Sequence, residues 1–260
     1  MKKDKTLPAF TREINLFFLA LTFLTRIPGP RWMTFSPEAL NKSSRYFTLT
    51  GLIVGTISAV VFILCSMVLP HSLSILMSMI ITIWLTGAFH EDGFADVCDA
   101  FGGGYSKEQI LTIMKDSRIG TYGTVGLVLI LASKYLCLLN LDRSITPFAI
   151  IAGHSISRFA STSVIFIYEY VREDALAKVK PLAGKMDMTG LLMNGLFGIA
   201  TVLFLGNWLY VLLIIPVIIA MLTTAEYFKR KIGGYTGDCL GTVQQITEVV
   251  FYLGLIMSFR

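Results

Sequence analysis

Charged residues are scarce in this sequence. They make up 15% of the 260 residues, and hydrophobic residues make up 54%, whereas about a quarter of the residues in an average soluble domain are charged. The four cysteines include no CxxC pair and no zinc-finger spacing, which argues against both a disulfide framework and a zinc site. Low-complexity segments and clear internal repeats are also lacking. The composition therefore indicates an integral membrane protein.

The sequence contains several long apolar runs. About seven runs of roughly 17 to 25 residues are long enough for a helix to cross a hydrocarbon core of roughly 30 Å. A transmembrane β-barrel would instead show short alternating strands, and an open sheet would leave backbone groups unpaired in lipid. We therefore predict an all-α polytopic transmembrane bundle that forms one domain over residues 1–260. The predicted spans cover about residues 47–69, 72–90, 121–140, 147–169, 189–205, 208–226 and 242–259.

The first apolar run is shorter than the others. It extends from Ile14 to Leu24 and is followed by Arg26-Ile27-Pro28 without a small-residue cleavage site. A secretory signal peptide would contain such a site. We therefore predict that this segment is retained as an interfacial or re-entrant helix.

The basic residues lie between the apolar runs and not on one soluble face. The net charge of +5 therefore indicates membrane topology, and we expect no nucleic-acid partner. The turns at Pro70-His71 and Gly206-Asn207 lack Lys and Arg, whereas the N-terminus and the longer loops, such as Arg172–Lys185, are rich in them. The positive-inside rule places these basic segments in the cytoplasm. We expect a multi-pass protein of the cytoplasmic (inner) membrane whose glycine-rich polar segments form a site on the cytoplasmic face.

A cluster of carboxylates follows the second predicted span. Asp92, Asp96 and Asp99 are spaced i, i+4 and i+7, so a helix that continued from the span would place them on one face. Carboxylates this close repel one another, and a divalent cation removes the repulsion. A solvated loop would explain a single aspartate, but three at helical spacing favour a metal site, and oxygen ligands suit Mg²⁺. The predicted ligands are Glu91, Asp92, Asp96 and Asp99.

Glycines follow the acidic cluster. Gly102 and Gly103 would let a phosphate approach the backbone closely, and a helix that starts near Ser106 would attract anions to its N–H groups. A flexible turn is the alternative explanation of the glycines. Their position beside the carboxylates favours substrate binding.

A basic segment closes the same loop. We predict that Arg118 binds phosphate oxygens in a bidentate manner and that Lys115 adds a positive charge. Asp116 is predicted either to complete the metal site or to orient Arg118. Anchoring at the membrane surface together with a helix cap is the alternative role of this segment.

Polar residues also occur near or within later spans. Asp238 is a candidate metal ligand or base, and Thr236 a candidate for binding phosphate or ribose. Arg158 interrupts an apolar run, where a charge costs about 2.5 to 3.5 kcal/mol on insertion scales. It should therefore face the interior and pair with an acid, either as a substrate contact or as a buried structural pair. We expect Lys134 to extend outward to the membrane surface, and Glu248 to face a partner or water.

These ordered motifs resemble the family of cobalamin 5′-phosphate synthases, also called adenosylcobinamide-GDP ribazoletransferases. The resemblance extends over nearly the whole chain. Two segments depart from the family pattern: Arg172–Ala177 lacks the usual glycine, and Gln245 stands where many members have Glu, so we assign Gln245 no catalytic role. The motifs are Phe23-Leu24-Thr25-Arg26-Ile27-Pro28, Phe89-His90-Glu91-Asp92-Gly93-Phe94-Ala95-Asp96 with Asp99, Met114-Lys115-Asp116-Ser117-Arg118-Ile119-Gly120-Thr121-Tyr122-Gly123, Ser157-Arg158 and Thr236-Gly237-Asp238-Cys239-Leu240-Gly241.

The resemblance implies a membrane transferase of cobalamin biosynthesis. Such an enzyme transfers the adenosylcobinamide phosphate moiety from adenosylcobinamide-GDP to α-ribazole or α-ribazole 5′-phosphate and releases GMP. It further implies that Mg²⁺ bridges the pyrophosphate and that His90 belongs to the substrate-binding residues. Asp238 is the candidate for accepting the proton of the attacking hydroxyl group. Membrane lipid is an expected partner, and a homo-oligomer and other cobalamin-assembly enzymes are further candidates.

Three alternatives share part of this pattern. CDP-alcohol phosphotransferases and membrane prenyltransferases also bind a metal and a pyrophosphate through clustered aspartates, but the former have Arg where Asp96 stands. A cation-coupled transporter would place carboxylates near the membrane midplane and often within repeated halves. The carboxylates of this sequence lie at a predicted membrane edge, which favours the transferase.

Overall fold

The computed structural model describes residues 8–171 and 185–258, which are helical apart from turns, loops and one isolated backbone bridge between Tyr170 and Tyr235. The all-α prediction is confirmed. The predictions made for the loop that begins at Arg172, and those for the lysines before residue 8, lie outside the described residues. The elements are α1 (Ala9–Leu24), α2 (Pro37–Ser43), the 3₁₀ segment η2 (Ser44–Tyr46), α3 (Phe47–Ser66), α4 (His71–Thr86), α5 (Phe89–Gly103), α6 (Lys107–Ile113), α7 (Thr121–Leu139), α8 (Thr146–Ile167), α9 (Met188–Leu203), the 3₁₀ segment η4 (Trp208–Leu213), α10 (Ile214–Ile232) and α11 (Gly237–Ser258).

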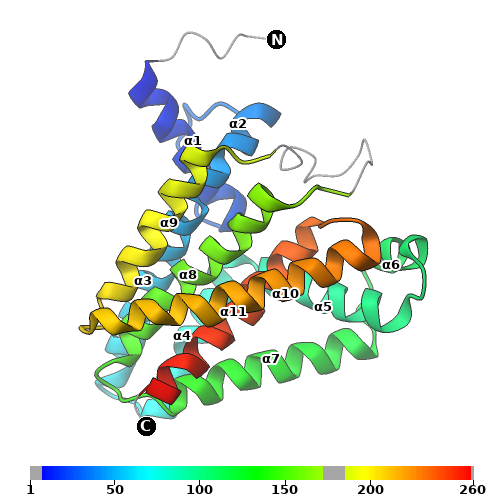
Figure 1. The fold of residues 1–260 in the computed structure, drawn as a ribbon. Coiled ribbons are helices and arrows are strands. Elements are labelled where there is room, and N and C mark those ends of the chain that lie inside the picture. Colours follow the sequence, from blue (N-terminus) through cyan, green and yellow to red (C-terminus); the bar gives the residue numbers. More distant parts are fainter. Residues whose placement is uncertain (1–7, 172–184, 259–260) are drawn as a thin grey trace.

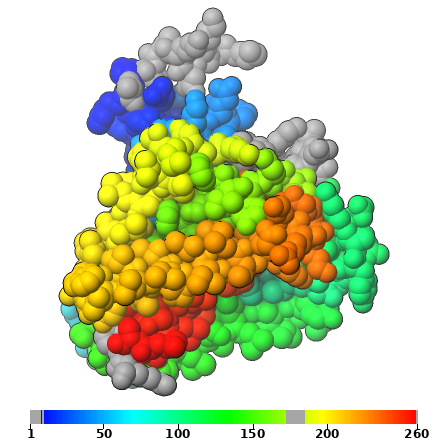
Figure 2. Space-filling model, viewed as in Figure 1, coloured from blue at the N-terminus to red at the C-terminus, as the bar shows by residue number. Residues whose placement is uncertain are grey.

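The long helices form a bundle in which α11 has a central place (Figure 1). It packs against α5, α7, α8 and α10, while α8 also packs against α3 and α9. Figure 2 shows α10 running across one face of the molecule between α9 and α11, with α6 at the edge. This outer helix exposes apolar side chains such as Ile215 and Ile219. An exposed apolar helix of this length is expected where a protein contacts lipid.

Five helical segments in the described part of the chain are long and apolar enough to cross a membrane. They are Pro37–Ser66, Thr121–Leu139, Thr146–Ile167, Trp208–Ile232 and Gly237–Ser258, and a sixth is obtained if α4 and α5 are counted together. The chain is therefore a multi-pass membrane protein, as predicted. The other two of the seven predicted spans correspond to α4, which is long enough to span only together with α5, and to α9, an apolar helix of 16 residues.

The second predicted span ends earlier than the sequence suggested. Gly87 and Ala88 both adopt the left-handed conformation, with φ of 66° and 58°, which glycine accepts readily and alanine does not. The helix axis bends by 86° there before α5 begins at Phe89. We expected the three aspartates to lie on a straight continuation of the span. They lie instead on a separate helix that turns away from it.

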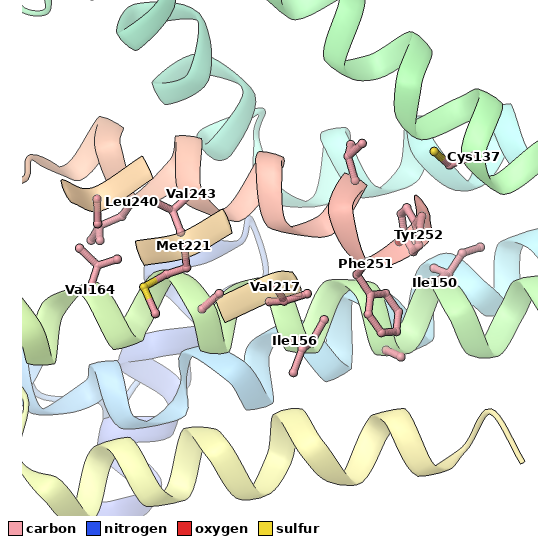
Figure 3. Packing of buried hydrophobic residues seen from close by; sticks show 14 of the residues in the cluster. Cys137, Ile150, Ile156, Val164, Val217, Met221, Leu240, Val243, Phe251 and Tyr252 are labelled. Atoms are coloured by element: carbon pink, nitrogen blue, oxygen red, sulfur yellow. The ribbon is translucent and has the colours of Figure 1, made fainter. Parts of the chain in front are cut away.

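The interface between α8, α10 and α11 is filled by apolar side chains. Figure 3 shows Val217 and Met221 of α10 lying between the other two helices, near Ile156 and Val243. All four are buried. Because lipid is as apolar as these side chains, close packing and internal polar contacts, and not exclusion of water, hold such helices together.

The N-terminal segment forms a helix, as predicted. Its end is attached to the bend between α4 and α5, because the Arg26 backbone N–H donates to the Leu85 carbonyl over 2.8 Å. A Cβ atom on Gly87 would lie 3.0 Å from Arg26 Nε. The Arg26 motif thus fixes the position from which α5 starts. Whether α1 lies at the membrane interface stays a prediction.

Candidate active site

The N-terminal half of α5 crosses the start of α11 at close range. A Cβ atom on Gly93 would lie 3.0 Å from the Asp238 Cα atom, and one on Gly241 would lie 3.1 Å from the His90 carbonyl oxygen. Two glycines therefore let the two backbones touch. The crossing places the Asp238 backbone against Gly93, which is next to Asp92 in the sequence and about one turn from Asp96.

The aspartates of α5 differ in their surroundings. Asp92 is exposed and Asp96 is half-buried, and both lie near the crossing with α11. In residues 8–171 and 185–258, no group of three or more His, Cys, Asp or Glu side chains is arranged to hold a metal ion. The donor chemistry nevertheless fits magnesium, because the crossing offers carboxylate oxygens from two helices.

Asp99 caps the next span. Its Oδ2 atom accepts a hydrogen bond from the Gly120 N–H over 2.7 Å, and its Oδ1 atom accepts one from the Gly123 N–H over 2.8 Å. These N–H groups belong to the first turn of α7, where intrahelical acceptors are missing. A carboxylate at a helix N-terminus is also favoured by the helix dipole. The structure thus gives this predicted metal ligand a structural task.

Arg118 and Asp116 form an exposed bidentate pair. The guanidinium Nη2 and Nε atoms donate to the Asp116 carboxylate over 2.7 and 3.1 Å, and the Arg118 backbone N–H donates to the same group. These hydrogen bonds lower the pKa of Asp116 and raise that of Arg118. Of the two predicted roles for Asp116, the structure shows the orientation of Arg118. Lys115 is exposed beside the pair.

The pair lines an open groove of about 1000 Å³. Asp99 and Gly120 form another part of its wall, together with Gly103 and Tyr122. The predicted helix start at Ser106 is confirmed by a capping box, in which the Ser106 hydroxyl accepts from the Gln109 N–H and the Gln109 side chain accepts in return. The groove is therefore wide, polar on one side and bounded by helix termini.

Gly102 and Gly103 are the last residues of α5 and not part of a loop. A Cβ atom on Gly102 would lie 2.6 Å from the Tyr122 ring, whereas one on Gly103 would meet only Ile113 at an ordinary 3.5 Å. The structure assigns Gly102 to the packing of α5 against α7. The expected contact between these backbone N–H groups and phosphate stays a prediction.

Thr236 precedes α11 and is fully buried. Its hydroxyl donates to Met114 Sδ over 3.1 Å and accepts from the Cys239 N–H over 3.4 Å. The side chain therefore caps α11 from within the protein. Its proposed contact with phosphate or ribose would require this hydroxyl group to become accessible.

A buried polar network lies deeper in the bundle. The prediction that Glu248 faces a partner or water is confirmed, but sequence reasoning did not identify Lys134 as that partner. Lys134 Nζ donates to Gln245 Oε1 over 2.9 Å and to Glu248 Oε2 over 3.0 Å. The prediction that Lys134 extends outward was wrong, because its side chain is only 6% exposed. The opposite charges of Lys134 and Glu248 in two separate apolar runs were the signal that could have revealed the pair.

Glu91 belongs to this interior network and not to the exposed side of α5. It is 5% exposed, and its Oε1 atom accepts from Gln245 Nε2 over 3.0 Å. Its Oε2 atom has no hydrogen-bond partner within the described part of the chain. Both Glu91 and Glu248 line a small cavity of about 10 Å³ inside the bundle. The structure therefore places the predicted ligand Glu91 on a different side of α5 from Asp92.

Arg158 is buried and faces the interior, as predicted. Glu248 and Glu91 interact with it electrostatically, but they do not form a close ion pair with it. Within the described residues no carboxylate lies within 4.0 Å of it, and its Nη1 atom donates to the carbonyl oxygen of His154 over 3.0 Å. The nearest polar neighbour is thus one turn earlier on the same helix. His90 is also buried, at the crossing of α5 and α11.

With this geometry established, comparisons with known proteins connect it to a family. Residues 16–256 match the family model described as cobalamin-5-phosphate synthase. The chain belongs to the cobalamin-5-phosphate synthase family. Two similar proteins, from Shewanella frigidimarina and Shewanella amazonensis, bear the name adenosylcobinamide-GDP ribazoletransferase. The first is 44% identical to this chain, over 94% of this chain and 95% of its own length. The second is 45% identical, over 95% of this chain and 97% of its own length.

The match with the cobalamin-5-phosphate synthase family covers the crossing of α5 and α11 and the residues from α5 to α7 that line the groove. It confirms the resemblance inferred from the sequence motifs and favours the transferase over the three alternatives. No solved structure matches this chain.

Proposed function

We propose that this chain is an adenosylcobinamide-GDP ribazoletransferase, and that its active site is formed by the α5–α11 crossing and the adjoining groove. The relatives that bear this name cover nearly the whole chain. The observation that carries the proposal is the meeting of Asp238 with the acidic helix α5. The other end of the same helix lines the groove that holds the oriented guanidinium of Arg118. Carboxylates and an arginine near one groove suit a pyrophosphate substrate.

In the proposed reaction, a hydroxyl oxygen of α-ribazole or its 5′-phosphate attacks the phosphorus that carries the cobinamide ester. A new bond forms between this phosphorus and the hydroxyl oxygen, the bond between the same phosphorus and the bridging oxygen breaks, and GMP leaves with the bridging oxygen. Asp238 accepts the proton of the attacking hydroxyl, while Arg118 and Lys115 bind the oxygens of the departing GMP. Such catalysis depends on positioning and on stabilisation of developing charge.

We assign the magnesium site to Asp92 and Asp96, with Asp238 as the third candidate ligand. When bound, the metal ion would neutralise the pyrophosphate and stabilise the leaving oxygen. Asp99 is left as the cap of α7, because both of its oxygens already accept hydrogen bonds. Glu91 is left in the interior network.

The function is tested by incubating the purified protein with adenosylcobinamide-GDP, α-ribazole or its 5′-phosphate, and Mg²⁺. We expect release of GMP together with a corrinoid that carries the nucleotide loop. Intact substrates after incubation with either acceptor would refute the function.

Two variants separate metal binding from helix capping. Asp92→Asn should raise the Mg²⁺ concentration needed for half-maximal activity by at least about tenfold, with little change in thermal stability, because the side chain is exposed. Asp99→Ala should lower stability by about 1 to 2 kcal/mol, as expected for a lost helix cap, without changing the Mg²⁺ requirement. A raised Mg²⁺ requirement in Asp99→Ala, with an unchanged requirement in Asp92→Asn, would instead indicate that Asp99 is a metal ligand.

We further propose that the site faces the cytoplasm from the inner membrane. The basic residues of the described loops, such as Lys107, Lys115 and Arg118, support this orientation through the positive-inside rule. Association with other cobalamin-assembly enzymes and formation of a homo-oligomer stay predictions.

A further inference from the structure

Another pocket adjoins the crossing of α5 and α11, since His90, Gly237 and Gly241 belong to its wall. It lies between the end of α1 and the starts of α3, α5 and α11, with α8 behind. Three phenylalanines contribute to its wall: Phe23 stacks on Phe47 with ring centroids 5.8 Å apart, and it meets the edge of Phe89 at 5.4 Å. Such a wall favours an apolar, planar group.

Arg158 lines this pocket and is only 2% exposed. Its Nη1 atom contacts His154, but its Nε atom has no hydrogen-bond partner within the described residues. A buried guanidinium needs a counter-charge or several acceptors, because the burial of an uncompensated charge costs several kcal/mol. Arg158 thus lines the pocket with a guanidinium whose donors its own helix satisfies only in part.

Glu248 and Glu91 interact with Arg158 electrostatically, but within the described residues neither carboxylate accepts a hydrogen bond from it. Glu248 is bound to Lys134 at 3.0 Å. Glu91 contacts Gln245 and, in the described part of the chain, lies beyond 4.0 Å from Arg158. The side chain of Arg158 is held in this arrangement by α3, because a Cβ atom on Gly51 would lie 2.7 Å from its Cδ atom. A fixed guanidinium at a pocket is a ready site for an anion.

His90 gives a second polar contact to the same pocket. It is 6% exposed, and its ring nitrogens make no hydrogen bond within residues 8–171 and 185–258. Two buried polar side chains from different helices, α5 and α8, thus border one space together with the phenylalanine rings. A wholly apolar ligand would leave both of them unsatisfied.

We propose that this pocket binds a phosphate ester joined to an apolar group, with the phosphate on Arg158 and the apolar group against Phe23, Phe47 and Phe89. Two ligands have this chemistry: a phosphorylated acceptor nucleoside with an aromatic base, and a membrane phospholipid. The first source rests on the proposed function, because the pocket adjoins the crossing that holds Asp238. Arg158 is then the residue that distinguishes a phosphorylated ligand from an unphosphorylated one.

Binding to the purified full-length protein in detergent, without the corrinoid donor, tests the first source. Calorimetric titration should show that α-ribazole 5′-phosphate binds at least about tenfold more tightly than α-ribazole, as expected for a charge-assisted bidentate contact. Arg158→Gln should abolish this difference. Arg45→Gln is the matched control, because Arg45 pairs with Glu13 and Asp187 away from the pocket, and it should keep the difference.

Native mass spectrometry tests the second source. If a lipid occupies the pocket, the wild type and Arg45→Gln should retain a bound phospholipid that Arg158→Gln loses. Phe89→Ala should weaken the binding of phosphorylated and unphosphorylated ligands equally, because it removes only part of the apolar wall.

The proposal is overturned if Arg158→Gln changes neither the nucleotide preference nor the retained lipid. Size-exclusion chromatography and thermal unfolding show whether that variant folds. If it does not, Arg158→Lys takes its place: this variant keeps the charge but loses the bidentate geometry, and an affinity equal to that of the wild type would refute the proposal. If ligand binding depends on Arg158 but no corrinoid is transferred, the binding site is supported and only the proposed function is refuted.

Discussion

At the scale of single residues, the exposed and buried charges of this protein act in different ways. The Asp116–Arg118 pair is exposed, so water and salt screen it and it contributes little to stability. Its effect is geometric, because three hydrogen bonds to the Asp116 carboxylate fix the guanidinium beside the groove. Lys134 and Glu248 are buried, and there the loss of one partner leaves a charge that water cannot reach.

Removal of the Asp116 carboxylate should therefore affect catalysis and not folding. Asp116→Asn is expected to lower kcat/KM about 10- to 100-fold, since small displacements of a positioning group have effects of this size, with an unchanged Tm. Measurement of GMP release checks this, with the exposed Asp142→Asn as control. A large fall in Tm would show that the pair is structural.

The pH dependence of this pair follows from the lowered pKa of Asp116. Its stabilising effect is complete above the unfolded value of about 3.9 and is lost as the pH falls through the lower folded value. Asp116 therefore stays ionised across the neutral range. An acid limb of the activity profile near neutral pH should be unaffected by Asp116→Asn.

The buried pair should control stability. Lys134→Met leaves Glu248 without its cation, and we expect a loss of about 3 to 5 kcal/mol, measured by thermal unfolding in detergent. The exposed pair of Arg230 and Glu226 is the control: Arg230→Gln should cost about 0.3 to 0.5 kcal/mol at most. The double variant Lys134→Met/Glu248→Gln should recover part of the loss. An unchanged Tm in Lys134→Met would show that the pair contributes nothing.

At the scale of helices, the α5–α11 crossing decides where the carboxylates meet. Gly93 and Gly241 permit contact between the two backbones, and the bend at Gly87 and Ala88 directs α5 toward that contact. The catalytic geometry thus depends on residues that carry no reactive group.

Gly93→Ala should separate the two helices and reduce activity at least about tenfold, because the added Cβ would press on the Asp238 backbone and displace the candidate base. Gly195→Ala is the matched control, since its Cβ would meet Phe159 at an ordinary 3.4 Å. Activity assays on both variants, with size-exclusion profiles to confirm folding, check the expectation. Equal activities would show that the crossing can adjust.

At the scale of the whole molecule, the loops carry a prediction about orientation. Tyr105 lies in the short connection between α5 and α6 and is 93% exposed, while Arg143 lies in the exposed connection between α7 and α8. With the four cysteines replaced, Tyr105→Cys should be protected from a membrane-impermeant maleimide in intact cells, whereas Arg143→Cys should react. Labelling in the reverse pattern would invert the predicted topology.

The sequence by itself determined the membrane class, the helical architecture, the start of α6 and the motifs that indicated the family. These properties follow from composition and local spacing: long apolar runs must form helices in lipid, and Ser106 and Gln109 cap a helix wherever it lies. Tertiary structure decided the rest. The separation of Glu91 from Asp92, the contact of Asp238 with Gly93, and the burial of Lys134 depend on which helices touch and at what angle, and residues far apart in the chain meet only through that packing.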